Sequence, residues 1–160
     1  MGAGGLDQTG NFLPGKILEG QSELPLGITD HSKQVKKGYM FLAYPGESSD
    51  GRNFIAEAIS AGALIILWES QNFDWREDWV VKNIPIENLR QKAGLIANYF
   101  YKNPSKKMWV VGVTGTNGKT SCASWISACL NQLGYPAATM GTMGCSFKKH
   151  NFESQNTTPG

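Results

Sequence analysis

The residues best suited to chemistry lie in one short glycine-rich segment, Gly115-Thr-Asn-Gly-Lys-Thr-Ser121. Glycines let backbone N–H groups approach phosphate oxygens without interference from a Cβ atom. Lys119 can reach the β- and γ-phosphates of a bound nucleotide, and the Thr120 hydroxyl is a typical ligand of Mg²⁺ in such loops. We therefore predict an ATP site in which Lys119 and Thr120 serve catalysis and Thr120 holds Mg²⁺.

The elements predicted on both sides of this segment fit a phosphate-binding loop. The apolar run at residues 108–113 predicts a buried strand, and apolar residues at helical spacing predict a helix over residues 119–133. The N-terminus of that helix would add partial positive charge at the phosphates. The general pattern G-x-x-x-x-G-K-[ST] has its first glycine where this chain has Val113. The remaining pattern still favours nucleotide binding over a plain glycine-rich turn.

Composition and charge argue against several other classes of protein. The chain has 160 residues, of which 41% are hydrophobic and 18% charged, and its net charge of +2 is too small to indicate nucleic-acid binding. No apolar run approaches the roughly 20 residues that span a bilayer. The three cysteines lack the spacing of a zinc site, and Cys122 and Cys129 are expected in the core. We expect a cytoplasmic protein that binds neither nucleic acid nor a membrane.

Strand and helix patterns alternate along the first hundred residues, which indicates an α/β unit with a mainly parallel sheet. Strands are predicted at 39–43, 63–67 and 80–81, and helices at 53–61 and 87–100. The polar stretch Tyr101–Lys107 contains a proline and forms the best boundary. We predict one domain at residues 1–104 and the beginning of a second at 105–160. The second has a strand at 137–140 after its helix and is too short for a complete P-loop domain.

Three further groups of side chains could indicate other functions, and each is weighed against a structural role. Asp30, His31 and Ser32 are consecutive, so they cannot hydrogen-bond in series as a catalytic triad. Trp68, Trp75 and Trp79 are scattered, without repeated basic residues between them, and are interpreted as local packing rather than as a base-stacking surface. For Asp50-Gly51-Arg52, a structural turn and a ligand contact both stay open.

Several motifs together resemble the Mur ligase family, whose members are ATP-dependent amide-bond ligases of peptidoglycan synthesis. In the second half these motifs are Val111-Gly-Val-Thr-Gly-Thr-Asn-Gly-Lys-Thr120, Met140-Gly-Thr142 and Asn156-Thr-Thr-Pro159. A phosphate loop without the earlier glycine is typical of this family. In the first half, Ser32-Lys33, Phe41-Leu-Ala43 and Asp50-Gly51-Arg52 look like the N-terminal domain of one branch. That branch adds meso-diaminopimelate or L-lysine to UDP-N-acetylmuramoyl-L-alanyl-D-glutamate.

The resemblance implies a UDP-binding α/β domain followed by the first βαβ unit of a Rossmann-like, P-loop central domain, which is truncated here. It implies ATP contacts at Gly115, Thr116, Asn117, Gly118, Lys119, Thr120 and Ser121. It also implies contacts to the UDP-sugar substrate at Asp30, Ser32, Glu47, Ser48, Ser49, Asn156, Thr157 and Thr158. The cofactors would be ATP and Mg²⁺, and the partners a UDP-N-acetylmuramoyl-dipeptide and an amino acid. We expect a monomer.

The chain departs from the family pattern in two places and leaves two alternatives open. The family commonly has Asp-Ser-Arg where this chain has His31-Ser32-Lys33, and Glu47 is unfavourable beside a pyrophosphate, which leaves contact through the backbone of its loop. The first alternative is another ligase of the superfamily, of the MurF, MurC or folylpolyglutamate type. The second is a nucleotide-binding module without catalysis. The 160-residue piece itself is expected to bind the UDP-sugar weakly and not to ligate.

Overall fold

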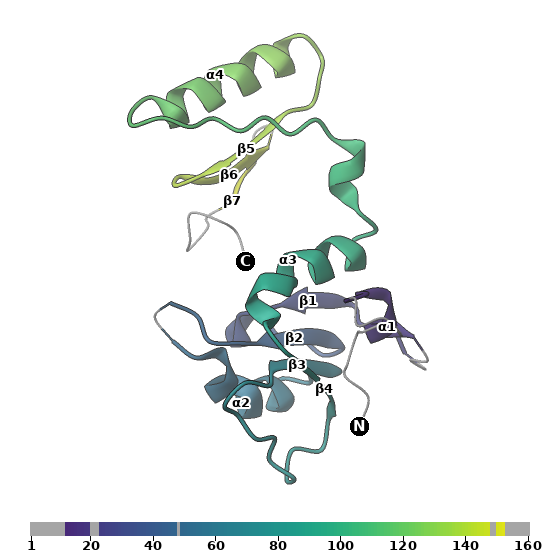
Figure 1. Ribbon diagram of the computed structural model, residues 1–160. Helices are drawn as coiled ribbons and strands as arrows, with labels where there is room; N and C mark the ends of the chain where they lie inside the picture. The colour runs from purple at the N-terminus through teal and green to yellow at the C-terminus, as the bar shows by residue number, and fades with distance from the viewer. Residues whose placement is uncertain (1–11, 20–22, 48, 148–149, 153–160) are drawn as a thin grey trace. The chain divides into compact units, whose positions relative to one another are not determined.

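Residues 12–19, 23–47, 49–147 and 150–152 are described by the computed structural model, which is shown in Figure 1. The chain divides into two compact units, Met1–Met108 (unit 1) and Trp109–Gly160 (unit 2). The described residues of unit 1 form a four-stranded sheet, and those of unit 2 form a three-stranded sheet. The two units therefore have separate sheets.

Unit 1 is a parallel α/β unit, as its alternating pattern predicts. Its strands pair in the order β1-β2-β3-β4, and every pairing is parallel. The strands are β1 (Gly27–Thr29), β2 (Tyr39–Ala43), β3 (Ile65–Glu69) and β4 (Lys82–Ile86). The helices are α1 (Gly15–Leu18), η1 (Ser32–Gln34), η2 (Gly51–Phe54), α2 (Ile55–Ser60), α3 (Leu89–Phe100) and η3 (Pro104–Lys107).

The core of unit 1 lies on both faces of this sheet. Successive strand side chains point to opposite faces, so Met40 and Leu42 belong to one apolar cluster while Phe41 and Ala43 belong to the other. The first cluster includes Ile96 of α3, and the second includes residues of α2. All five residues of β3 are buried, as expected of an inner strand whose two faces are covered.

Most elements predicted for unit 1 are present, with shifted ends. The strand predicted at 39–43 is β2, and the strand predicted at 63–67 is β3, which lies further along the chain. The strand predicted at 80–81 is wrong, because β4 begins only at Lys82. Pro85 lies inside β4, which a proline without an N–H donor tolerates because β4 is an edge strand. The tryptophans pack as predicted: the ring centroids of Trp68 and Trp75 are 5.6 Å apart, and those of Trp75 and Trp79 are 5.0 Å apart.

The described residues of unit 2 form one helix and an antiparallel meander. The helix α4 (Lys119–Gln132) confirms the prediction from residue 119, and β5 (Ala138–Gly141) confirms a strand near residue 140. The strand β5 pairs with β6 (Gly144–Phe147), which pairs with β7 (His150–Phe152), both antiparallel. In the described residues of unit 2, the sheet therefore follows α4 and has no strand before it.

The predicted strand at 108–113 is wrong. These residues have no regular structure, and Trp109 is 99% exposed. A strand is stable only when neighbouring strands take up its N–H and C=O groups, and β5, β6 and β7 pair with one another instead. The apolar run therefore indicates a segment that needs neighbouring strands, but it does not indicate which strands those are.

The apolar stripe of α4 is likewise open to solvent. Trp125, Leu130 and Leu133 are exposed, and so are Cys122 and Cys129, which corrects the expectation that these cysteines lie in the core. Helical spacing predicts which side chains share a face, but it does not supply the element that covers that face. No helix among the described residues combines the length and the apolar character needed to cross a bilayer.

Candidate functional site

The glycine-rich loop of unit 2 has a backbone conformation that requires its glycines. Gly115 has φ +147° and Gly118 has φ +78°, both in the region that glycine adopts far more easily than other residues. A Cβ atom on Gly118 would meet nothing within 4 Å, so the conformation, and not lack of space, selects glycine there. The Gly118 carbonyl accepts the Cys122 N–H at 2.9 Å, so this glycine directly precedes the first turn of α4.

Lys119 lies over this loop. Its Nζ atom donates to the Gly115 carbonyl at 2.6 Å and to the Thr116 carbonyl at 3.2 Å. The three ion pairs found in the described part of the chain do not include Lys119. The ammonium charge is thus held at the loop by carbonyl groups, which an anion can replace.

The remaining predicted ATP contacts are accessible. Thr116, Asn117, Thr120 and Ser121 are all exposed around the start of α4, where free backbone N–H groups carry partial positive charge. Mg²⁺ commonly takes only one or two protein ligands and completes its shell with phosphate oxygens and water. An exposed Thr120 hydroxyl at the start of the helix fits that role.

In unit 1, the predicted contacts to the UDP-sugar follow the carboxyl ends of β1 and β2. Carboxyl ends of parallel strands share one edge of the sheet, where open α/β folds bind ligands. Asp30 follows β1 and accepts a hydrogen bond of 2.5 Å from the hydroxyl of Tyr44, which follows β2. Glu47 and Ser49 are exposed in the next loop, whereas Ser32 is buried at the start of η1. Ser48, Asn156, Thr157 and Thr158 lie outside the described residues.

Tyr44 gives unit 1 a predicted dependence on pH. Burial and the hydrogen bond to Asp30 raise the pKa of the Tyr44 phenol well above its usual value. Above about pH 10 the unfolded chain loses this proton while the folded protein keeps it, so the free energy of unfolding falls as the pH rises. Urea unfolding at about pH 8 and about pH 11 should show a smaller loss for Tyr44→Phe than for the unsubstituted chain. Equal losses in the two proteins would contradict the role given to Tyr44.

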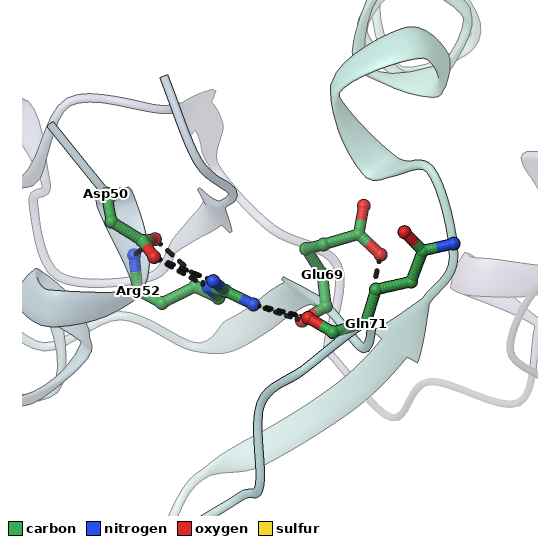
Figure 2. Close-up of polar contacts among 4 residues, drawn as sticks. All are labelled: Asp50, Arg52, Glu69 and Gln71. Carbon is green, nitrogen blue, oxygen red and sulfur yellow. Dashed lines mark hydrogen bonds and ion pairs between the residues drawn. The ribbon is translucent and has the colours of Figure 1, made fainter. Parts of the chain in front are cut away.

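The structure favours the structural interpretation of Asp50-Gly51-Arg52 (Figure 2). The Arg52 side chain is 10% exposed and forms a forked ion pair with Asp50, with Nε 3.0 Å from Oδ1 and Nη2 2.7 Å from Oδ2. Its Nη1 donates to the Gln71 carbonyl at 2.7 Å. The guanidinium also lies 4.9 Å from the centroid of the Phe73 ring. Arg52 is therefore engaged by the protein itself.

Two charged residues near this edge were not found from the sequence. Glu69, at the end of β3, accepts the N–H groups of Gln71 and Asn88 at 3.2 Å each and that of Leu89 at 2.8 Å. It therefore caps the start of α3 from a distant part of the chain, for which no local sequence signal exists. Arg90, in the first turn of α3, forms an ion pair with Glu47 at 2.9 Å. Arg90 also lines a hollow of about 300 Å³ beside Pro45, Arg52 and Glu69.

Both halves of the chain match known protein families. Residues 27–101 match the profile described as the catalytic domain of the Mur ligase family, and residues 113–160 match the Mur ligase middle domain. A relative from Nitrosomonas europaea is 43% identical over 128 residues, which make up 80% of this chain and 25% of the relative. That relative is named UDP-N-acetylmuramoyl-L-alanyl-D-glutamate–2,6-diaminopimelate ligase. The chain thus spans about a quarter of the length of the relative.

Solved structures are also similar to this chain. The MurF ligase from Thermotoga maritima in complex with ADP has a TM-score of 0.53 and 29% identity, and the match covers 70% of this chain and 25% of that one. A structure named UDP-N-acetylmuramoyl-L-alanyl-D-glutamate–2,6-diaminopimelate ligase has a TM-score of 0.56 and 24% identity, over 79% of this chain and 26% of that one. The second likeness concerns the fold. The family profiles, the sequence relative and the shared fold agree: this chain belongs to the Mur ligase family.

Proposed function

We propose that this chain is the N-terminal part of an ATP-dependent ligase that adds 2,6-diaminopimelate to UDP-N-acetylmuramoyl-L-alanyl-D-glutamate. The proposal rests on one observation above all: the segment that is 43% identical to a diaminopimelate ligase also carries the glycine-rich loop with Lys119 held over it. L-Lysine remains the alternative amino acid. A MurF-type ligase remains the second candidate, favoured by the fold shared with the Thermotoga maritima enzyme.

In this proposal the loop of unit 2 binds the nucleotide phosphates. Backbone N–H groups from Gly115 to Ser121 face the phosphate oxygens, Lys119 offsets negative charge at the γ-phosphate, and Thr120 ligates Mg²⁺. ATP supplies the phosphoryl group: an oxygen of the D-glutamyl γ-carboxylate attacks the γ-phosphorus, and ADP leaves. The amine of the incoming amino acid then attacks the acyl phosphate, phosphate leaves, and the amine loses a proton. The contribution of the chain is positioning and charge neutralisation.

The carboxyl edge of the parallel sheet in unit 1 would bind the UDP end of the substrate. Asp30, Ser32 and the loop Glu47-Ser48-Ser49 follow β1 and β2, on the edge where α/β folds hold nucleotides. Asn156, Thr157 and Thr158 would contact the muramoyl-peptide side. We place the functional boundary after residue 104, with the UDP-sugar domain at 1–104 and the start of the ATP domain at 105–160. We also propose a cytoplasmic monomer that binds neither nucleic acid nor a membrane.

Two experiments test the proposal. Isothermal titration of this chain with UDP-N-acetylmuramoyl-L-alanyl-D-glutamate should show weak binding that UDP competes for. A chimera in which this chain replaces the segment it matches in the Nitrosomonas europaea relative should ligate diaminopimelate with ATP. A folded chimera that binds both substrates without turnover would instead favour a nucleotide-binding module, and one that uses only lysine would correct the amino acid.

Arg90 should support UDP binding by neutralising Glu47. A lone carboxylate in this loop would repel a diphosphate, and the ion pair of 2.9 Å offsets that charge. We expect Arg90→Ala to weaken UDP binding roughly fivefold at low salt, the upper range for an exposed ion pair, and to weaken it less at high salt. Titration calorimetry measures both values. Arg76→Ala removes an arginine from another exposed pair and should leave UDP binding unchanged.

A further inference from the structure

We infer that Arg52 is a positioning residue: it fixes the loop at residues 45–50 in the shape that binds the UDP-sugar, without touching the ligand. This inference rests on the proposed function of that loop. It assigns a role to the contacts drawn in Figure 2, in which Arg52 lies between Asp50 on one side and the end of β3 on the other.

The loop at 45–50 is closed at its base, and its described residues Glu47 and Ser49 are exposed. Pro45 and Asp50 form an isolated antiparallel bridge, and the Gly46 N–H donates to the Ser49 carbonyl at 2.8 Å. The Gly51 N–H donates to the Tyr44 carbonyl at 2.9 Å. A Cβ atom on Gly51 would lie 2.9 Å from that carbonyl oxygen. The two backbone segments at the base of the loop are therefore too close together for any residue except glycine at position 51. The exposed residues Glu47 and Ser49 are thus carried by two closely spaced backbone segments.

Arg52 joins the base of this loop to the end of β3. Besides the fork to the Asp50 carboxylate, Nη1 reaches the Gln71 carbonyl at 2.7 Å and lies 3.5 Å from the Glu69 carbonyl. The backbone after β3 is tied in turn to α3, because the Glu69 carboxylate accepts the N–H groups of Asn88 and Leu89. The Arg52 guanidinium therefore links the loop to the end of β3, and the Glu69 carboxylate links the end of β3 to the start of α3.

The same contacts argue against Arg52 as a ligand for the diphosphate. Nε and Nη2 are directed at the Asp50 carboxylate, Nη1 is directed at a carbonyl, and one face of the guanidinium lies against Phe73. A diphosphate would have to displace the Asp50 carboxylate and the Gln71 carbonyl to reach these donors. Asp50 and the carbonyls already neutralise and orient the guanidinium, which suits a fixed support.

Arg52→Lys tests the inference in this chain, because lysine keeps the charge but cannot make the fork and the carbonyl contact together. We expect the dissociation constant for UDP to rise about tenfold, the effect of losing one charge-assisted hydrogen bond. Amide hydrogen exchange of Gly46 and Gly51 should accelerate by a similar factor. Exchange at Leu64, whose N–H donates to the Tyr39 carbonyl near the start of β2, should stay unchanged. Asp50→Asn should show the same pattern.

Arg76→Lys is the matched control. Arg76 also forms a fork with an aspartate two residues away, Asp78, and lies 5.4 Å from the Trp79 ring centroid, but its side chain is 64% exposed. The Arg76→Lys substitution should change neither the dissociation constant for UDP nor the rate of amide exchange at Gly51.

Three other outcomes overturn the inference, each in a distinct way. Equal acceleration at Gly51 and Leu64 would mean that Arg52 only adds global stability. Weaker UDP binding with unchanged exchange in the loop would make Arg52 a direct ligand contact. No change in either measurement would remove any role in the loop. If the unsubstituted chain fails to bind UDP, the proposed UDP-sugar site fails, and exchange at Gly51 alone then decides whether Arg52 holds the loop.

Discussion

Lys119→Met is expected to reduce the ligation rate of the chimera described above by roughly 10³-fold, at the upper end of the range for removing one preorganised charge or donor at a reacting centre. The Lys119 ammonium lies on the carbonyls of Gly115 and Thr116, at the mouth of the glycine-rich loop. Methionine preserves length and helix propensity but carries no charge, so repulsion around the γ-phosphate is no longer offset. Single-turnover assays with saturating ATP measure the chemical step directly.

Lys107→Met provides the matched control, because Lys107 is an exposed lysine in η3, outside the loop. It should leave the single-turnover rate unchanged. A Lys119→Met chimera that retains its rate and loses only affinity for ATP would show that this lysine binds the ground state and transition state equally, which contradicts a catalytic role.

The parallel sheet of unit 1 could be predicted from the sequence because its signals are local. The buried run Tyr39–Ala43 and the apolar run that became β3 each carry their own pattern and are bounded by glycine or polar residues. The conformation of the glycine-rich loop could also be predicted from the sequence, since the left-handed conformation of Gly118 follows from its residue type and from the helix that begins beside it.

The contacts that hold unit 1 together at its carboxyl edge could not be predicted in the same way. Arg52 contacts the backbone of Gln71, and Glu69 contacts the backbone of Leu89, 20 residues further along the chain. Neither contact follows from a periodic sequence pattern or from a fixed spacing between the two residues. The strand predicted at 108–113 is wrong for the same reason. Its apolar side chains favour burial, but whether a segment forms a strand depends on a neighbouring strand with which it can pair.

Glu69→Ala is expected to lower the free energy of unfolding of unit 1 by about 3 kcal/mol, because it leaves backbone N–H groups at the start of α3 without their buried acceptor. Glu69 is 8% exposed, so water does not readily replace the carboxylate. Urea unfolding followed by tryptophan fluorescence should report the change, since Trp68 precedes Glu69 in β3 and is buried. Glu77→Ala, in an exposed loop, should change the free energy by less than about 0.5 kcal/mol.

Glu69→Gln separates the hydrogen bonds from the charge. The amide keeps one oxygen, so it retains part of the cap and should cost about 1 kcal/mol. Loss of the cap also affects Leu89, whose N–H donates to Glu69 and whose side chain is fully buried. If the first turn of α3 frays, this side chain leaves the core, which adds to the loss in the free energy of unfolding. If Glu69→Ala were no more destabilising than Glu77→Ala, α3 would be held by the burial of Leu89 and Ile96 alone. In that case the Glu69 carboxylate would not connect the end of β3, which Arg52 contacts, to the start of α3.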